Sequence, residues 1–188
     1  MDRLAFLAAP GIWALLAGVI FVIYGLSGRL AYINILGIIK YYKNVFTKKR
    51  DFAFFMIFPL IIAISSALHA NVDEDLSQLM AIVLTILTSM VLSFMVMTNG
   101  RYENSMGKED KDLGDLQLRE RNQDALAVGA YEILVSILVL ILIFLLPIAN
   151  GNDTAQRFMS FFIYYGFYSF LLNVFIIVRR LFQIYLNK

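Results

Sequence analysis

KYYKNVFTKKRDFAFFMIFPLII, residues 40–62, passes from a basic, aromatic run directly into an apolar one, with no spacer between the two. The whole 188-residue chain is built in this way: 60% of its residues are hydrophobic, and its 16 Lys and Arg and 14 Asp and Glu gather in a few intervals. Its mean hydropathy of +0.73 lies far above that of water-soluble domains. The sequence therefore predicts a chain that crosses a membrane repeatedly.

Four apolar runs have the length of membrane-spanning helices, and they cover residues 52–68, 79–98, 126–149 and 158–178. A helix rises about 1.5 Å per residue and needs roughly 20 residues to cross about 30 Å of hydrocarbon. Lipid offers no hydrogen-bond partner to a bare backbone, so each run is expected to be helical. The predicted fold class is all-α, a polytopic membrane helical bundle with four spans and a fifth at the amino terminus.

The fifth span is expected in residues 4–26, a run of 23 residues without a charge. Pro10, Gly11 and a centrally placed Trp13 leave an interfacial or re-entrant helix as an alternative. A cleaved signal peptide is a second alternative, and we expect the segment to be retained instead.

Charge sets the expected orientation of these spans. Counted on alternate sides, 14 of the 16 Lys and Arg fall on one face of the membrane, which the positive-inside rule makes cytoplasmic. We expect a multi-pass protein of the bacterial inner (plasma) membrane with a cytoplasmic carboxyl terminus. Its parts are an amino-terminal span with a basic juxtamembrane helix (1–51), a helix hairpin (52–98), a charged cytoplasmic loop (99–125) and a second hairpin with a cationic tail (126–188).

Two of these parts carry candidate binding residues. Apolar residues in the segment 27–51 have the spacing of an amphipathic helix, whose cations would contact anionic lipid or simply anchor the topology. These membrane-surface cations are Lys40, Lys43, Lys48, Lys49 and Arg50. The loop 99–125 is predicted to be a flexible linker in its first half and a charged helix from Asp110, and it is either a solvated connection or the docking site of a cytosolic protein. The candidate partner-binding residues are Arg101, Lys108, Lys111, Asp112, Asp115, Arg119 and Arg121.

Polar side chains inside the spans form the remaining candidate site, for helix packing or for lining a pore. Thr85, Ser89 and Ser93 recur every four residues with Thr88 beside them, so they share a helix face. Glu132 is the only carboxylate within an apolar run, and it either reaches headgroup water or has a buried partner such as Asn99, Arg179 or a residue of another subunit. Asn173 in the last span is similarly ambiguous.

Residues that carry catalysis are not found. The chain has no cysteine and one histidine, and it has no phosphate-binding glycine loop and no nucleophile elbow. We therefore predict no enzyme, no metal site and no cofactor. A net charge of +2 also argues against direct nucleic-acid binding.

The segments RDFAFFMIFPLIIAI and LTILTSMVLSFMVM, followed by a charged interval and two more spans, resemble the membrane subunits of bacterial anti-phage defence systems of the Kiwa type. That resemblance covers residues 52–178 and implies an oligomeric sensor that pairs with a cytosolic DNA-binding effector. The run 4–26 departs from the four-span pattern of that family.

The sequence thus predicts a non-enzymatic, homo-oligomeric membrane sensor or scaffold that contacts lipid and recruits a cytosolic effector. The alternative is an ion channel or small-solute permeation protein formed by subunit assembly. An assembly subunit of a larger complex is a third possibility.

Overall fold

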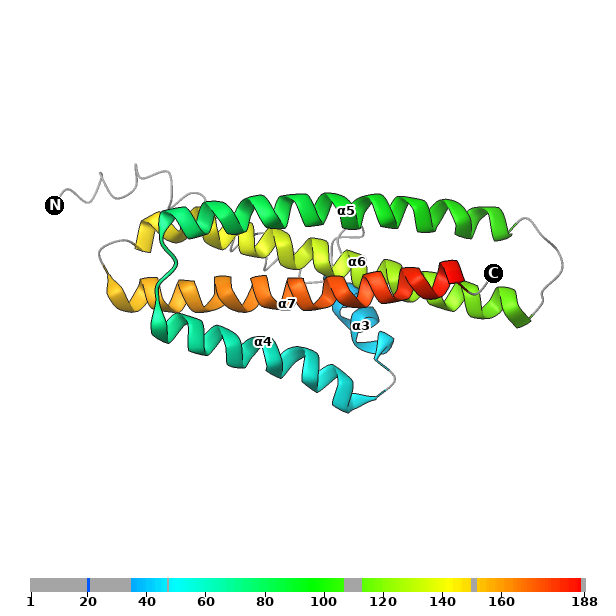
Figure 1. Ribbon diagram of the computed structural model, residues 1–188, viewed down its shortest axis with the longest axis horizontal. Coiled ribbons are helices and arrows are strands. Elements are labelled where there is room, and N and C mark those ends of the chain that lie inside the picture. Colours follow the sequence, from blue (N-terminus) through cyan, green and yellow to red (C-terminus); the bar gives the residue numbers. More distant parts are fainter. Residues whose placement is uncertain (1–19, 21–34, 47, 107–112, 150–151, 187–188) are drawn as a thin grey trace.

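The computed structural model describes residues 20, 35–46, 48–106, 113–149 and 152–186 (Figure 1). The described chain is helical and contains no strand. Its elements are α3 (Ile35–Val45), α4 (Lys49–His69), α5 (Glu74–Met106), α6 (Leu113–Leu145), the 3-10 turn η1 (Leu146–Ala149) and α7 (Asp153–Leu186). The all-α fold class is confirmed.

Four of the helices are long and apolar enough to cross a membrane, over Lys49–His69, Glu74–Thr98, Gln123–Ala149 and Asp153–Arg179. They confirm the four predicted spans to within a few residues at most ends. Large apolar side chains cover their outer surfaces, with Leu68, Val96 and Phe175 each at least 70% exposed. Such a surface suits lipid and not water, so the chain is a multi-pass membrane protein. Apart from Ile20, the predicted span 4–26 lies outside the described residues.

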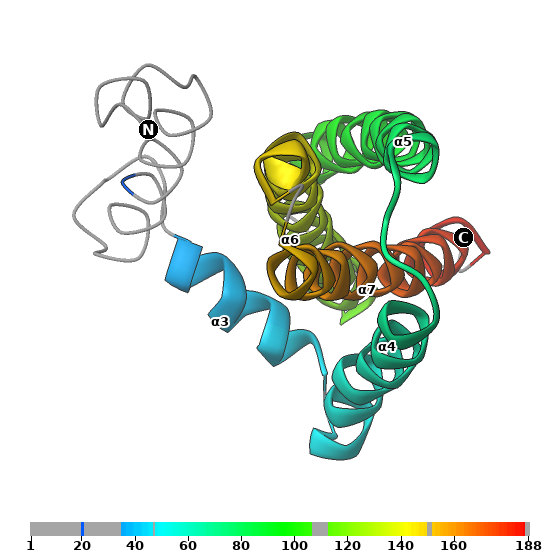
Figure 2. The ribbon, with the colours of Figure 1, turned by 90° about the vertical axis from the view of Figure 1, so that its left-hand side faces the viewer.

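Helix α7 is central to the bundle, because it packs between α4 and α6, and α6 in turn packs against α5 and α3 (Figure 1). Helices α4 and α5 follow each other in the chain but barely touch. Figure 2 shows the connection 70–73 passing across the end of the bundle to join them. We call this end the turn end, because the chain passes there from α4 to α5 and from α6 to α7.

Two glycines allow the helices to approach closely. A Cβ atom on Gly166 of α7 would overlap the Cγ2 methyl of Val139 on α6. A Cβ on Gly129 of α6 would lie 2.8 Å from the sulfur of Met95 on α5. Small residues at helix contacts are typical of membrane bundles, where close packing replaces the hydrophobic drive.

One face of α7 makes polar contacts with the C-terminal part of α4 and with the connection that follows it. The Tyr168 hydroxyl lies 3.2 Å from the Ser66 hydroxyl, and Tyr164 donates to the Ala70 carbonyl at 3.4 Å. The hydroxyl of Ser160 accepts a hydrogen bond of 2.9 Å from the backbone N–H of Val72. Ser160, Tyr164 and Tyr168 are spaced by four, which places all three on the α4 side of α7.

The connection 99–125 differs from its prediction in its first half. Helix α5 continues through Gly100 to Met106, so the flexible linker expected there is wrong up to that residue. The helix expected in the second half is present and begins, among the described residues, at Leu113. Both helices run on past their membrane spans and form a projecting hairpin at the end opposite to the turn end (Figure 1). A glycine inside a helix costs only about 1 kcal/mol relative to alanine, which the rest of the helix can offset.

Candidate functional site

Glu132 is the central residue of the candidate site. It lies on α6 about 14 Å along the helix from the start of the span, and its side chain is 0% exposed. Of the two alternatives considered for Glu132, the one in which its carboxyl reaches headgroup water is excluded, because the protein itself encloses the side chain. A carboxyl removed from both water and headgroups requires a local explanation.

The neighbour of Glu132 across the helix contact is Asn173 of α7. The Asn173 side chain is also 0% exposed, and its amide lies beside the Glu132 carboxyl. The sequence singled out both residues without pairing them, and the structure brings them together. Of the partners considered for Glu132, Arg179 is exposed instead, and the side chain of Asn99 is outside the described set.

Tyr42 of α3 completes the contact from outside the four spans. Its hydroxyl donates a hydrogen bond of 2.8 Å to Oδ1 of Asn173, and its ring is only 1% exposed. The ring also stacks on Tyr131 of α6, with centroids 3.8 Å apart and planes inclined by 11°. Burial raises the pKa of Tyr42 well above its usual value, with the nearby Tyr131 and Glu132 adding to the rise, so the hydroxyl remains a donor.

Hydrogen bonding at this site is incomplete. Both carboxyl oxygens of Glu132, the Asn173 amide nitrogen and the Ser169 hydroxyl have no partner of good geometry within the described chain. Ser169 precedes Asn173 by one helical turn and lies beside the Tyr131 phenol. We call Tyr42, Tyr131, Glu132, Ser169 and Asn173 the polar cluster. A buried polar group without a partner costs about 1–3 kcal/mol, so the hydrogen bonding of this cluster bears on the stability of the bundle.

The energy of the Glu132 carboxyl depends on the groups around it in the polar cluster. Glu132 has no cationic partner among the described residues, so its negative charge would be uncompensated in a low-dielectric site. A shift of α3, entry of water, or a new hydrogen-bond donor would each alter the energy of this carboxyl. The described chain offers no group of three or more residues able to hold a metal ion.

The polar stripe predicted on the second span lies elsewhere. Thr85, Ser89 and Ser93 are exposed on α5, and each hydroxyl donates to the backbone carbonyl four residues earlier at 2.8–3.0 Å. Thr88 is half-buried, and its hydroxyl has no partner in the described chain. The stripe is thus separate from the polar cluster and faces outward from the bundle.

The charged candidates lie on α3, at the start of α4, on α5 and α6, or outside the described residues. Lys40 and Lys43 are exposed on α3, and Lys48, Lys49 and Arg50 are exposed at the start of α4. Among the predicted partner-binding residues, Arg101 lies on α5, and three lie on α6, namely Asp115, Arg119 and Arg121. Lys108, Lys111 and Asp112 fall outside the described residues.

Sequence reasoning missed Tyr42, Tyr131 and Ser169. The ring of Tyr42 fits the apolar face of the amphipathic helix expected there, so the spacing alone indicates no role for its hydroxyl. The spacing of four between Ser169 and Asn173 was a usable signal, because it places two polar groups on one face of the last span.

Comparison of the chain with protein-family models, with curated proteins and with solved structures found no match.

Proposed function

We propose that this protein is a non-enzymatic membrane sensor in which α3 is a movable surface helix and the hydrogen bond from Tyr42 to Asn173 is its latch. That hydrogen bond is the observation that carries the proposal. It joins a short helix bearing Lys40 and Lys43 to the interior of the bundle, beside the buried carboxyl of Glu132.

The latch has the energetics of a switch. Helix α3 has 11 residues, and isolated helices of that length are marginal in water, so its order depends on docking. It docks on α6, the helix that also carries Glu132 and continues into the projecting hairpin. Release of α3 would expose Tyr131 and Glu132 and change the contacts of α6, whose extension would pass the change to a cytosolic effector.

The proposal also covers the cellular location of the protein and its contact with a second copy. We place the chain in a bacterial inner membrane with the hairpin and carboxyl terminus in the cytoplasm, and we assign the outward Thr85, Ser89 and Ser93 face of α5 to contact with a second copy. The resemblance to anti-phage membrane subunits supports phage infection as the disturbance that is sensed. Since the chain has no native cysteine, an impermeant thiol reagent would label a cysteine at Asp75 but not one at Lys48 in intact cells.

Partner recruitment can be tested at the hairpin. Lys108, Lys111, Asp112 and Asp115 would be replaced by Gln or Asn, and cytosolic proteins would be recovered by cross-linking in the native host. A matched control would neutralise Asp153 and Arg157 at the turn end. We expect the hairpin variant to lose the recovered effector and the control to keep it. Equal recovery from both variants would refute the assignment of the hairpin.

The second candidate function is cation or proton permeation, and the buried carboxyl of Glu132, which has no cationic partner among the described residues, favours it. The self-bonded hydroxyls of α5 weigh against the stripe as a polar pore lining, because their hydrogen-bond donors are already used. Proton and potassium flux would be measured in proteoliposomes under voltage and tension, with wild type and Glu132→Gln. Flux that Glu132→Gln abolishes would favour permeation over the latch.

A further inference from the structure

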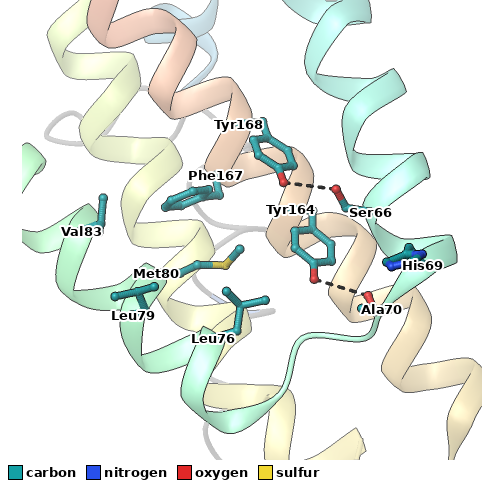
Figure 3. A pocket seen from close by; sticks show the side chains of 10 residues that line it. All are labelled: Ser66, His69, Ala70, Leu76, Leu79, Met80, Val83, Tyr164, Phe167 and Tyr168. Atoms are coloured by element: carbon teal, nitrogen blue, oxygen red, sulfur yellow. Dashed lines mark hydrogen bonds between the residues drawn. The ribbon is translucent and has the colours of Figure 1, made fainter.

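Two hollows open beside α4 at the turn end. The larger one, of about 360 Å³, lies between α4 and α5, and the hydroxyls of Tyr164 and Tyr168 point across it to the Ala70 carbonyl and Ser66 (Figure 3). His69 is its only basic lining residue, and neither a carboxylate nor a Lys or Arg lines it. The second hollow, of about 300 Å³, differs because an arginine forms part of its wall.

This second hollow is a groove between the C-terminal part of α4 and the first turns of α7. Apolar side chains from both helices form most of its walls, namely Ile64, Ala67, Leu68, Phe158 and Phe161. It opens on the opposite side of α4 from the larger hollow, because Ile64 and Leu68 are offset by two residues, about 160° around the helix, from Ser66 and Ala70.

The apolar walls of the groove are open to the surroundings of the bundle. Leu68 is 75% exposed, Phe158 is 64% exposed and Ile64 is 44% exposed. All three lie in helices that are long and apolar enough to cross a membrane, so the medium they face is lipid. The part of an occupant that lies along these walls is therefore hydrocarbon, such as an acyl chain.

Arg157 closes the groove near the membrane surface. It lies four residues into its span, about 6 Å along α7, where a long cationic side chain reaches the headgroups. Thr154, one helical turn earlier, lines the same wall. The sequence has no other Lys or Arg between residues 51 and 100 or between residues 122 and 178.

The charge of Arg157 is not used within the described chain. Arg157 forms no ion pair there, even with the exposed Asp153 one helical turn before it. A guanidinium group can donate two parallel N–H bonds to a phosphate, and no carboxylate lines the groove to compete for it. The groove thus combines an apolar channel with one phosphate-binding side chain at its polar end.

We propose that this groove binds one molecule of an anionic phospholipid. An acyl chain lies along Ile64, Leu68 and Phe158, and the phosphate lies on Arg157. An anionic lipid is favoured because the ammonium of a zwitterionic head group already compensates its own phosphate. The groove contains no residue of the polar cluster and lies at the opposite end from the projecting hairpin. Loss of the lipid should therefore change neither docking of α3 nor recovery of a cytosolic partner.

Binding would be measured by quenching of a single tryptophan with brominated lipid. Trp13→Phe removes the only native tryptophan, and Phe158→Trp then places a reporter in the groove. Phe144→Trp is the control reporter, because Phe144 is 71% exposed near the same end of α6 and is outside the groove. Each reporter protein is reconstituted in phosphatidylcholine vesicles with increasing dibrominated phosphatidylglycerol, which gives the affinity for phosphatidylglycerol relative to phosphatidylcholine at that site.

The groove reporter should prefer phosphatidylglycerol about fivefold, which corresponds to roughly 1 kcal/mol per cation at a membrane surface. The Phe144→Trp reporter should show a ratio of about one. Arg157→Gln should lower the ratio at the groove to about one, and Arg179→Gln, at the other end of α7, should leave it unchanged. The same ratio with and without Arg157 would overturn the assignment of the phosphate.

The acyl chain has its own variant, Ile64→Phe, which narrows the groove at a partly exposed position. Ile57→Phe is the matched control, because Ile57 lies on the same helix, is 51% exposed and is outside the groove. We expect Ile64→Phe to lower the preference at least about twofold, and equal ratios in the two variants would overturn the seating of the chain. Dibrominated phosphatidylcholine that quenches Phe144→Trp but not Phe158→Trp would overturn lipid as the occupant, since a second copy would then cover the groove.

Discussion

Replacing Tyr42 by Phe tests the contact that joins α3 to the bundle. The substitution removes one hydroxyl and retains the ring, so the stack on Tyr131 and the burial of the side chain persist. Only the 2.8 Å hydrogen bond to Asn173 is lost. Tyr41 provides a matched control, because it is the neighbouring tyrosine of the same helix and is 68% exposed.

The size of the effect follows from what the substitution leaves behind. Oδ1 of Asn173 would become a buried acceptor without a donor, which costs about 1–3 kcal/mol. Each 1.4 kcal/mol corresponds to a factor of about ten in an equilibrium constant. The undocked population of α3 should therefore rise by roughly 5- to 150-fold in Tyr42→Phe. In Tyr41→Phe it should not change, because that hydroxyl is solvated.

Hydrogen exchange measured by mass spectrometry in nanodiscs reads this population directly. Backbone amides of Ile35–Val45 exchange when α3 undocks, so their protection should fall by the same factor. Amides of α4 in the same sample serve as an internal reference. Equal protection of α3 in Tyr42→Phe and Tyr41→Phe would refute the latch.

Three further outcomes follow from the packing and from the pKa of Tyr42. Gly166→Ala should lower the apparent Tm by several degrees in detergent, because overpacking against the stiff, buried Val139 costs about 1–3 kcal/mol. Gly129→Ala should leave the Tm nearly unchanged, because the flexible Met95 side chain can move. Ser160→Ala should cost about 1–3 kcal/mol in equilibrium unfolding by leaving a buried N–H without an acceptor, and Ser65→Ala on the exposed face of α4 should cost little. The pKa of Tyr42 is raised in the folded protein, so its hydrogen bond stabilises docked α3 fully at pH values below the unfolded pKa of 10.0. Protection of the α3 amides should therefore be constant from about pH 7 to 9 and fall only above about pH 10.

Much of the fold could be predicted from sequence because length and hydropathy alone determine where a helix can span lipid. The four spans and the helix within 27–51 required no knowledge of contacts. The order in which the helices pack could not be predicted in this way. Lipid is as apolar as a helix contact, so the outward Phe175 and the inward Phe170 look alike in sequence. The linker expected in the first half of 99–125 is helical up to Met106, because a glycine such as Gly100 favours a break that the rest of the helix can offset.

The polar cluster illustrates a second limit. Glu132 and Asn173 stood out in sequence because polar side chains are costly inside a membrane. Their partner Tyr42 did not, because a tyrosine on an amphipathic helix satisfies the apolar pattern by its ring alone. The contact joins residues 131 positions apart, and no local rule connects them.

Helix α7 connects α4 on one of its sides with α6 and α3 on another. Tyr164 and Tyr168 face α4, whereas Ser169 and Asn173 face α6 and α3, and the two pairs are offset by five residues, about 140° around the helix. A rigid helix cannot rotate one face without rotating the other. A rotation of α7 that displaced Tyr168 from Ser66 would therefore also strain the hydrogen bond between Asn173 and Tyr42.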